Sequence, residues 1–297
     1  MSDKKYIRFD WAAKKMLRDK ANFGILEGFL SELLQDNIEI NSILESETNK
    51  ENEEDKFNRV DLLVRNTKNE FIIIEIQNTR ELDYLLRILF STSKTIVENI
   101  KESAAYSKIK KVITISILYF DLGQGKDYIY HGTTNYVGKH TNDNLQLSPG
   151  QKKLFQNEQV YQLLPEHYLI RISTYDEKTI GLSKEKFDEW VYFLKTSEIK
   201  DDFTAKGLNE ARQKLYVLNM PSEEQAAYNR YLDKLRTEAS VAETFKFEAE
   251  EKVREAKSIE IAMEMIFDKE PIDKIIRYTK LDKQTIEKLI NELKNSH

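Results

Sequence analysis

Two neighbouring runs decide the fold of this chain: Asn58-Arg59-Val60-Asp61-Leu62-Leu63-Val64-Arg65 and Glu70-Phe71-Ile72-Ile73-Ile74-Glu75-Ile76-Gln77. Both are rich in β-branched residues, and the polar stretch Asn66-Thr67-Lys68-Asn69 separates them. This pattern predicts two antiparallel strands joined by a tight turn. Asp61 and Glu75 interrupt the apolar runs, and acids in such a setting need a partner.

The register of this hairpin brings the two acids together. Side chains alternate faces along a strand, so a hairpin that pairs residue 65 with 71 also pairs 63 with 73 and 61 with 75. The Cβ atoms of Asp61 and Glu75 would then lie roughly 5 Å apart. Two carboxylates this close repel unless a cation lies between them or one is protonated. Because no cysteine and no paired histidine lies nearby, the oxygen ligands favour Mg²⁺ or Mn²⁺ over zinc.

The elements around the hairpin predict an α/β fold. Apolar residues at helical spacing predict a helix over 22–35 and a longer one over 82–100. Strands are expected before and after the hairpin, at 42–47 and 111–120, so the elements follow the order α-β-β-β-α-β. Further strands are expected at 128–130, 160–164 and 168–172.

The C-terminal part has a different character. Residues 222–267 are rich in Glu, Ala and Lys and predict one or two long exposed helices that favour self-association. Beyond Pro271, two short helices around Lys280-Leu281-Asp282 resemble a small helix-turn-helix. Seven basic and six acidic side chains lie between Asp268 and Lys294, a weak basic face for a DNA reader, so packing on the long helix or on a second chain is favoured. We therefore expect two domains, 1–200 and 201–297.

Composition limits the possible functions. The formal net charge of −5 over 297 residues argues against a protein that coats DNA, so nucleic-acid binding must use a local basic patch or metal-bridged phosphates. The absence of cysteine rules out disulfides and thiolate catalysis. No apolar run approaches the ~20 residues that span a bilayer. The charged start Met1-Ser2-Asp3-Lys4-Lys5 predicts no signal peptide and a cytoplasmic location.

The spacing Asp-X(13)-Glu-X-Gln resembles the PD-(D/E)XK nuclease superfamily. Two positions depart from its motif, since Val60 stands where Pro is usual and Gln77 stands where Lys is usual. The Glu-X-Gln variant narrows the resemblance to the recombination-promoting nuclease or transposase family of bacteria. Asp10 and Arg87 match further marks of that family.

The resemblance implies a restriction-endonuclease-like core with a mixed sheet and a C-terminal helical extension. It also implies a metal-dependent DNA endonuclease linked to recombination or mobile elements. Asp61 and Glu75, with the backbone carbonyl of Ile76, would hold Mg²⁺ or Mn²⁺, and Gln77 would orient the attacking water. A neutral amide does not stabilise developing negative charge as Lys would, so turnover is expected to be slow unless Arg87 or Lys94 compensates.

Four further candidate site residues each have an alternative structural role: Asp10, Glu27, Arg87 and Lys94. Asp10 is either a family site acid or the N-cap of a short helix over 11–18. Glu27 is an extra metal ligand from the first helix or, with more weight, a solvated glutamate. Arg87 and Lys94 lie seven residues apart on one helix face, where they clamp a phosphate or line a solvated face.

Two rival functions follow from the same residues. The first is a catalytically weak DNA-binding or assembly protein in which the long helices do the work. The second is an RNA-directed phosphodiesterase, since a metal site alone does not select the sugar.

Overall fold

The computed structural model describes residues 6–15, 17, 19–44, 61–176 and 185–295. The chain divides into two compact units, Met1–Met220 and Pro221–His297. The first unit contains the sheet and the second is helical.

The first unit is built on one mixed sheet with the strand order β1-β2-β3-β4-β6-β5. Strand β2 is antiparallel to both β1 and β3. Strands β3, β4 and β6 are parallel to one another, and β5 is antiparallel to β6. The strands are β1 (Ile40–Leu44), β2 (Leu62–Asn66), β3 (Phe71–Gln77), β4 (Val112–Leu118), β5 (Ile129–Gly132) and β6 (Glu166–Arg171).

The predicted hairpin is present as β2 and β3, and its register is the expected one. Arg65 lies opposite Phe71, and Leu63 lies opposite Ile73. The turn closes because the Asn69 N–H donates to the Asn66 carbonyl at 3.0 Å, with Asn69 in the left-handed region at φ 60°. Asparagine tolerates that conformation better than most residues. The polar turn therefore sets the register of the strands that carry Asp61 and Glu75.

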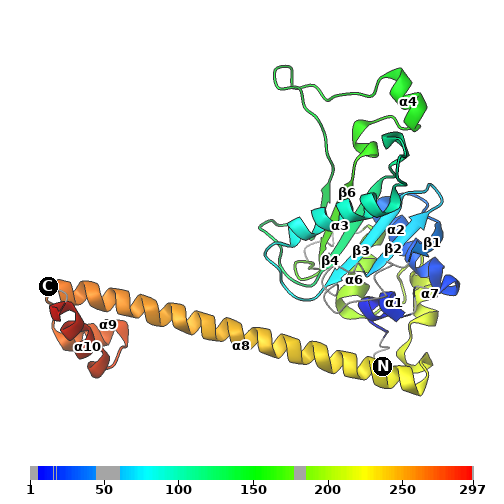
Figure 1. The fold of residues 1–297 in the computed structure, drawn as a ribbon. Coiled ribbons are helices and arrows are strands. Elements are labelled where there is room, and N and C mark those ends of the chain that lie inside the picture. The colour runs from blue at the N-terminus through cyan, green and yellow to red at the C-terminus, as the bar shows by residue number, and fades with distance from the viewer. Residues whose placement is uncertain (1–5, 16, 18, 45–60, 177–184, 296–297) are drawn as a thin grey trace. The chain divides into compact units, whose positions relative to one another are not determined.

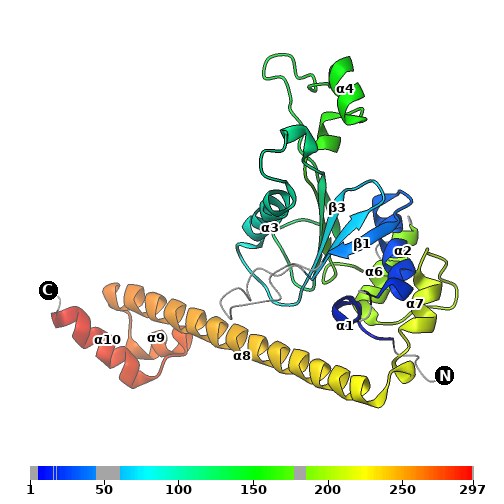
Figure 2. The ribbon, with the colours of Figure 1, turned by 45° about the vertical axis from the view of Figure 1, so that its right-hand side comes forward.

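Helices cover both faces of the sheet: α3 lies on one face, and α1, α2, α6 and α7 lie on the other (Figures 1 and 2). These helices are α1 (Phe9–Lys15), α2 (Phe23–Leu34), α3 (Tyr84–Asn99), α6 (Lys186–Thr196) and α7 (Leu208–Lys214). A short helix, α4 (Pro149–Phe155), lies in the excursion between β5 and β6. The 3₁₀ turns among the described residues include η1 (Lys20–Asn22), η4 (Tyr106–Lys108), η5 (Val160–Leu163) and η6 (Val217–Asn219). The predicted order α-β-β-β-α-β is confirmed.

An aromatic cluster joins three of the helices on the second face. The fully buried Trp190 of α6 lies 5.5 Å from Phe29 of α2 and 6.1 Å from Phe9 of α1, measured between ring centroids. Edge-to-face contacts of this kind add to the free energy gained by burial. The cluster anchors α1 beside the strand ends where the predicted site lies.

Helix α3 forms over the predicted stretch, but its leucine stripe faces outward. Exposed apolar side chains on and just before this helix are Leu82, Leu85, Leu86, Leu89, Phe90 and Val97. The face turned to the sheet carries Tyr84, Ile88, Ser91, Thr92 and Thr95. The sheet below is itself partly polar, and the hydroxyls of Thr92 and Thr114 lie 2.9 Å apart in a hydrogen bond. Hydroxyl side chains fit this surface because buried polar groups require partners.

The boundary between the units lies about twenty residues later than the expected 200/201, because α7 belongs to the sheet unit. Helix α7 begins after Gly207 at φ 84°, where α2 comes so close that a Cβ on Gly28 would lie 2.3 Å from the Lys206 carbonyl oxygen. The Trp190 indole donates to the same carbonyl at 3.0 Å. Residues 201–220 therefore complete the layer of α2 and α6.

Two strand predictions need correction. The predicted strand at 160–164 is instead the 3₁₀ turn η5 (Val160–Leu163), and the side chains of Gln159 and Gln162 bond each other's backbone N–H at its start. The place beside β4 is taken by β6, which follows directly. The first predicted strand, 42–47, is observed as β1 (Ile40–Leu44), and residues 45–47 lie outside the described residues.

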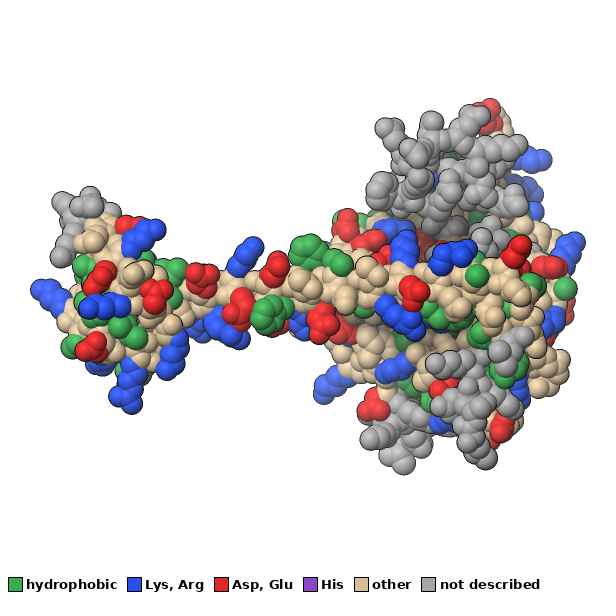
Figure 3. Space-filling view, turned by 90° about the horizontal axis from the view of Figure 1, so that it is seen from below, with side chains coloured by type: hydrophobic (Ala, Val, Ile, Leu, Met, Phe, Trp, Pro, Cys, Tyr) green, Lys and Arg blue, Asp and Glu red, His purple; other side chains and the backbone are tan. Residues whose placement is uncertain are grey.

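The second unit consists of α8 (Ser222–Phe267), α9 (Ile272–Thr279) and α10 (Lys283–Asn295). The two short helices pack on the end of α8 around the buried residues Ala262, Ile275 and Ile286. This confirms that the helical hairpin packs on the long helix. Acidic and basic side chains alternate over α8 and around α9 and α10 (Figure 3). Even α8, the longest described helix, has no segment apolar enough to cross a membrane.

Candidate active site

The two predicted acids meet at one end of the sheet, where β2 begins and β3 ends. The recorded ladder runs to Leu62 opposite Ile74, so the next step sets Asp61 opposite Glu75. The Asp61 carboxylate reaches across to β3 and accepts a hydrogen bond from the Ile76 N–H at 2.7 Å. The local sequence therefore folds so that one acid is fixed against the backbone beside the other.

The carbonyl of Ile76 faces the same edge as Asp61. The Gln77 carbonyl accepts a hydrogen bond from Tyr119, which follows β4. Since successive residues in a strand turn their backbone groups to opposite edges, the N–H and the C=O of Ile76 both point to the β2 side. Three oxygen-bearing groups, from Asp61, Glu75 and Ile76, thus belong to one corner of the sheet.

Glu75 is almost completely enclosed, with 2% of its surface exposed. Its Oε2 accepts a hydrogen bond from the Tyr84 hydroxyl at 3.2 Å and lies 3.9 Å from Nε of Arg87. Burial raises the pKa of Glu75, Arg87 and Tyr84 oppose this, and the charge of Asp61 raises it further. A buried carboxylate beside a second acid is a setting that a bound cation would relieve.

Arg87 projects toward Glu75. Its Nη1 also donates to both carboxylate oxygens of Glu81, at 2.9 and 3.1 Å. The guanidinium therefore lies between two acids and retains partial exposure. Lys94 lies two helical turns further on, ~10 Å along the axis, and pairs with Glu98 at 3.7 Å. The structure brings Arg87, but not Lys94, to Glu75.

Gln77 ends β3 on the face that carries Glu75 and is half-buried. Within the described part of the chain, its side-chain amide makes no hydrogen bond. The amide is therefore available to a water or a substrate at this corner.

Asp10 lies at the same end of β3 but beneath the other face of the sheet. It is fully buried and accepts hydrogen bonds from Arg8 at 3.0 and 3.1 Å and from Asn78 at 3.4 Å. Arg8 lies over the Tyr119 ring, whose hydroxyl donates to the Leu194 carbonyl of α6. Helix α1 begins before Asp10, at Phe9, so Asp10 is not its N-cap.

Glu27 is not brought to the acid pair. Its carboxylate accepts a hydrogen bond from the Ile40 N–H at 2.8 Å, at the start of β1. Ile40 pairs with Asn66, at the end of β2 opposite to Asp61. Glu27 therefore stabilises the edge strand.

Three residues around Glu75 and Arg87 leave no signal in the sequence. Tyr84 begins α3 and Glu81 precedes it, where both resemble ordinary helix-start residues. Ser116 lies opposite Glu75 in the parallel ladder between β3 and β4. No local pattern reveals such a partner, because the pairing joins strands far apart in the sequence.

The described residues contain no group of three or more Asp, Glu, His or Cys arranged to hold a metal. A magnesium ion needs fewer, since it keeps several waters and is held by one or two carboxylates. The pair Asp61 and Glu75 with the Ile76 carbonyl satisfies that smaller requirement, and its donors are all oxygen.

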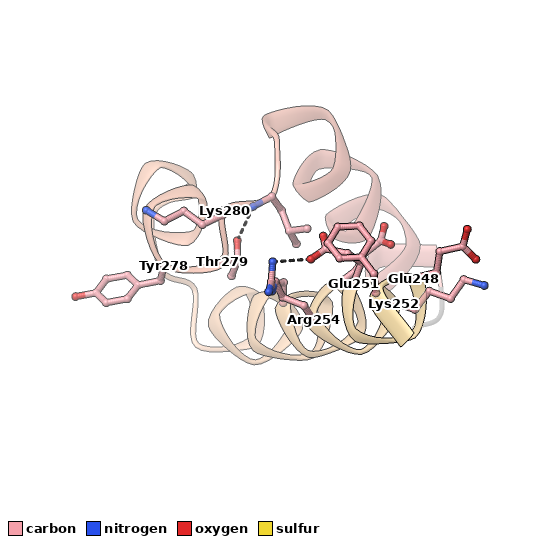
Figure 4. A pocket seen from close by; sticks show the side chains of 11 residues that line it. Glu248, Glu251, Lys252, Arg254, Tyr278, Thr279 and Lys280 are labelled. Carbon is pink, nitrogen blue, oxygen red and sulfur yellow. Dashed lines mark hydrogen bonds and ion pairs between the residues drawn. The ribbon is translucent and has the colours of Figure 1, made fainter. Parts of the chain in front are cut away.

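A hollow lies in the helical unit, where α8 meets the turn between α9 and α10 (Figure 4). This open groove has a volume of about 650 Å³. Its charged lining is balanced between three acids and three bases: Glu248, Glu251, Glu255, Lys252, Arg254 and Lys280. Arg254 is already paired with Glu251 at 2.6 Å. The groove therefore lacks the single-sign field that would attract a phosphate.

Comparison with protein families matches residues 7–245 to the PD-(D/E)XK nuclease family transposase. Comparison with curated proteins and with solved structures gives no significant match. The family match covers most of the chain, including both strands of the hairpin and the helix that carries Arg87. The mixed sheet with helices on both faces agrees with the match. The chain belongs to the PD-(D/E)XK nuclease family transposases.

Proposed function

We propose that this protein is a metal-dependent DNA endonuclease whose active site is the corner formed by Asp61, Glu75 and the Ile76 carbonyl. The observation that carries the proposal is the contact of the Asp61 carboxylate with the Ile76 N–H, directly beside the buried Glu75. The oxygen-only donors suit Mg²⁺ or Mn²⁺. A bound divalent ion would polarise the scissile phosphate and lower the pKa of an attacking water.

The protein's own groups have separate tasks in this proposal. Gln77 orients the attacking water through its side-chain amide. Arg87 supplies the positive charge that a lysine at position 77 would otherwise provide, and it contacts the phosphate. Because Glu81 shares the guanidinium at 2.9 Å, part of that charge is compensated. We therefore expect slow turnover, which keeps a DNA-binding role with weak catalysis as the second candidate.

The family description supports DNA as the substrate and a role in recombination or mobile elements. The helical unit supports self-association, because only Tyr228 and Ala262 of the 46 residues in α8 are buried. The exposed apolar side chains of α8 include Val241, Phe245, Phe247 and Val253. We propose that these side chains contact a second copy of the chain.

The test is a cleavage assay with the purified full chain on supercoiled plasmid, linear DNA and RNA, with Mg²⁺, Mn²⁺ or EDTA. Cleavage of DNA is expected with either metal and not with EDTA. Glu75→Gln should abolish it, and Arg87→Ala should reduce it by on the order of 100-fold. Glu27→Gln and Lys94→Ala are the matched controls, since neither side chain contacts Glu75. Metal-independent cleavage, or an active Glu75→Gln variant, would reject the proposed site, and preferential cleavage of RNA would reject the substrate.

A further inference from the structure

The Tyr84 phenol is a buried polar group in contact with Glu75. Tyr84 begins α3, has no exposed surface and packs with Ile88, Leu118 and Phe120. Its ring meets Phe120 edge to face, with the ring centroids 5.9 Å apart. Phenylalanine would fill this apolar cluster equally well, so packing alone does not account for the hydroxyl.

The Tyr84 hydroxyl donates a hydrogen bond to Oε2 of Glu75 at 3.2 Å. A buried hydroxyl is costly unless it is bonded, so this contact explains why a tyrosine is tolerated here. Nε of Arg87 approaches the same oxygen, at 3.9 Å. The Ser91 side chain lies within reach of the same carboxylate. The phenol thus holds one carboxylate oxygen of Glu75, Oε2, in a fixed position.

Ser116 adds a second hydroxyl on the same face of the sheet. It lies opposite Glu75 in the β3–β4 ladder and is fully buried. Its Oγ has no hydrogen-bond partner within the described residues, although it lies beside the Tyr84 hydroxyl. A buried hydroxyl without a partner indicates a group that is completed by a ligand or by a bound water.

We propose that Tyr84 is a positioning residue for the metal site, with Ser116 in support. The phenol fixes the rotamer of Glu75 through Oε2 and so orients the carboxylate toward the cation. The proposal rests on the proposed function, because it takes Glu75 as a ligand. Hydrogen bonds from outer groups to ligating carboxylates are a general means of orienting metal ligands.

The test is Mn²⁺ binding by the full chain, measured by isothermal titration calorimetry without nucleic acid. Tyr84→Phe keeps the ring and removes the hydroxyl, and it should weaken Mn²⁺ binding roughly 10–100-fold. The matched control is Tyr175→Phe, which removes another buried hydroxyl, bonded to the Asp188 carbonyl at 3.3 Å. The control should bind Mn²⁺ like the wild type. A purely structural role of Tyr84 would lower the melting temperature and leave Mn²⁺ affinity unchanged.

Glu75→Gln separates the two proposals. If it binds Mn²⁺ as tightly as the wild type, the proposed site is wrong and the role of Tyr84 falls with it. If Glu75→Gln loses binding while Tyr84→Phe binds like Tyr175→Phe, the positioning role is overturned and the proposed function stands. Should Tyr84→Phe fail to fold, Ser116→Ala replaces it in the test. Several-fold weaker Mn²⁺ binding by Ser116→Ala would support the proposal that the two hydroxyls position Glu75, and wild-type affinity would overturn that proposal.

Discussion

The backbone N–H of Ile76 donates a 2.7 Å hydrogen bond to the carboxylate of Asp61. An acid that precedes β2 is thereby fixed to the strand that carries the buried Glu75. A substitution of Asp61 removes a charge and, depending on the new side chain, also a backbone hydrogen bond. Asparagine removes only the charge, whereas alanine removes both.

Asp61→Asn is expected to lose cleavage at least ~100-fold, the upper end of the loss seen for outer partners of metal ligands. Its stability in EDTA should equal or slightly exceed that of the wild type, because the repulsion with Glu75 is relieved. Asp61→Ala should be less stable than Asp61→Asn by about 1 kcal/mol, since Ile76 loses its acceptor. Melting curves with and without Mg²⁺ measure the stability of the two variants, and the cleavage assay measures their activity. Full cleavage by Asp61→Asn would remove Asp61 from the active site.

The orientation of α3 is tested by two neighbouring residues. Ile88 is 4% exposed and Leu89 is 61% exposed. Ile88→Ala should cost roughly 2–5 kcal/mol through the cavity it leaves, and Leu89→Ala should cost less than ~0.5 kcal/mol. Urea denaturation of the two variants measures the difference. The reverse order would mean that the leucine stripe packs on the sheet.

Helix α3 also shows what a sequence pattern leaves open. The leucines that predict the helix give its clearest periodicity, yet the face bearing Ser91, Thr92 and Thr95 meets the sheet. The choice depends on Thr114 and Ser116 in β4, which make the opposing surface partly polar. Periodicity indicates that a helix forms, but the burial of a face depends on the surface it meets.

The candidate site likewise has a part that the sequence predicts and a part that it does not. The pairing of Asp61 with Glu75 follows from a turn and a two-residue alternation, both local, so the sequence predicts it. Tyr84 and Ser116 reach Glu75 through helix packing and parallel pairing, which leave no local signal. Glu27 matches a possible ligand by its place in the first helix but serves the far end of β2 instead.

Glu166 provides a pH-dependent contribution to stability. It is buried at the start of β6, where it pairs with Lys111 and accepts hydrogen bonds from Tyr168 at 2.8 Å and His131 at 2.6 Å. Burial alone would raise its pKa, but these partners hold the pKa of Glu166 below the ordinary 4.5. A depressed pKa stabilises the folded state above the unfolded-state pKa, and this contribution is lost as the pH falls through the folded-state pKa.

Glu166→Gln should therefore be less stable than the wild type by about 1–3 kcal/mol at pH 7. The difference should shrink as the pH falls below 4.5, because the carboxyl of the unfolded chain takes up a proton first and the folded state follows at its lower pKa. Chemical denaturation at pH 7, 5 and 3.5 measures it. A difference that stays constant or grows toward acid would show that the charge of Glu166 is not what stabilises the fold.

The boundary at Met220 predicts which truncation still folds. A chain ending at 220 keeps the sheet and α7, whose Leu208 and Ala211 are fully buried, as is the following Leu215. It should unfold cooperatively and retain cleavage, while self-association, measured by analytical ultracentrifugation, should fall because α8 is gone. A chain ending at 200 is the matched control. Because it lacks α7, the apolar face of α2 that α7 covers would be exposed, and this chain should not fold stably. Failure of the 1–220 chain to fold would mean that the helical unit is part of the core. A 1–200 chain as stable as the 1–220 chain would mean that α7 is not part of the core.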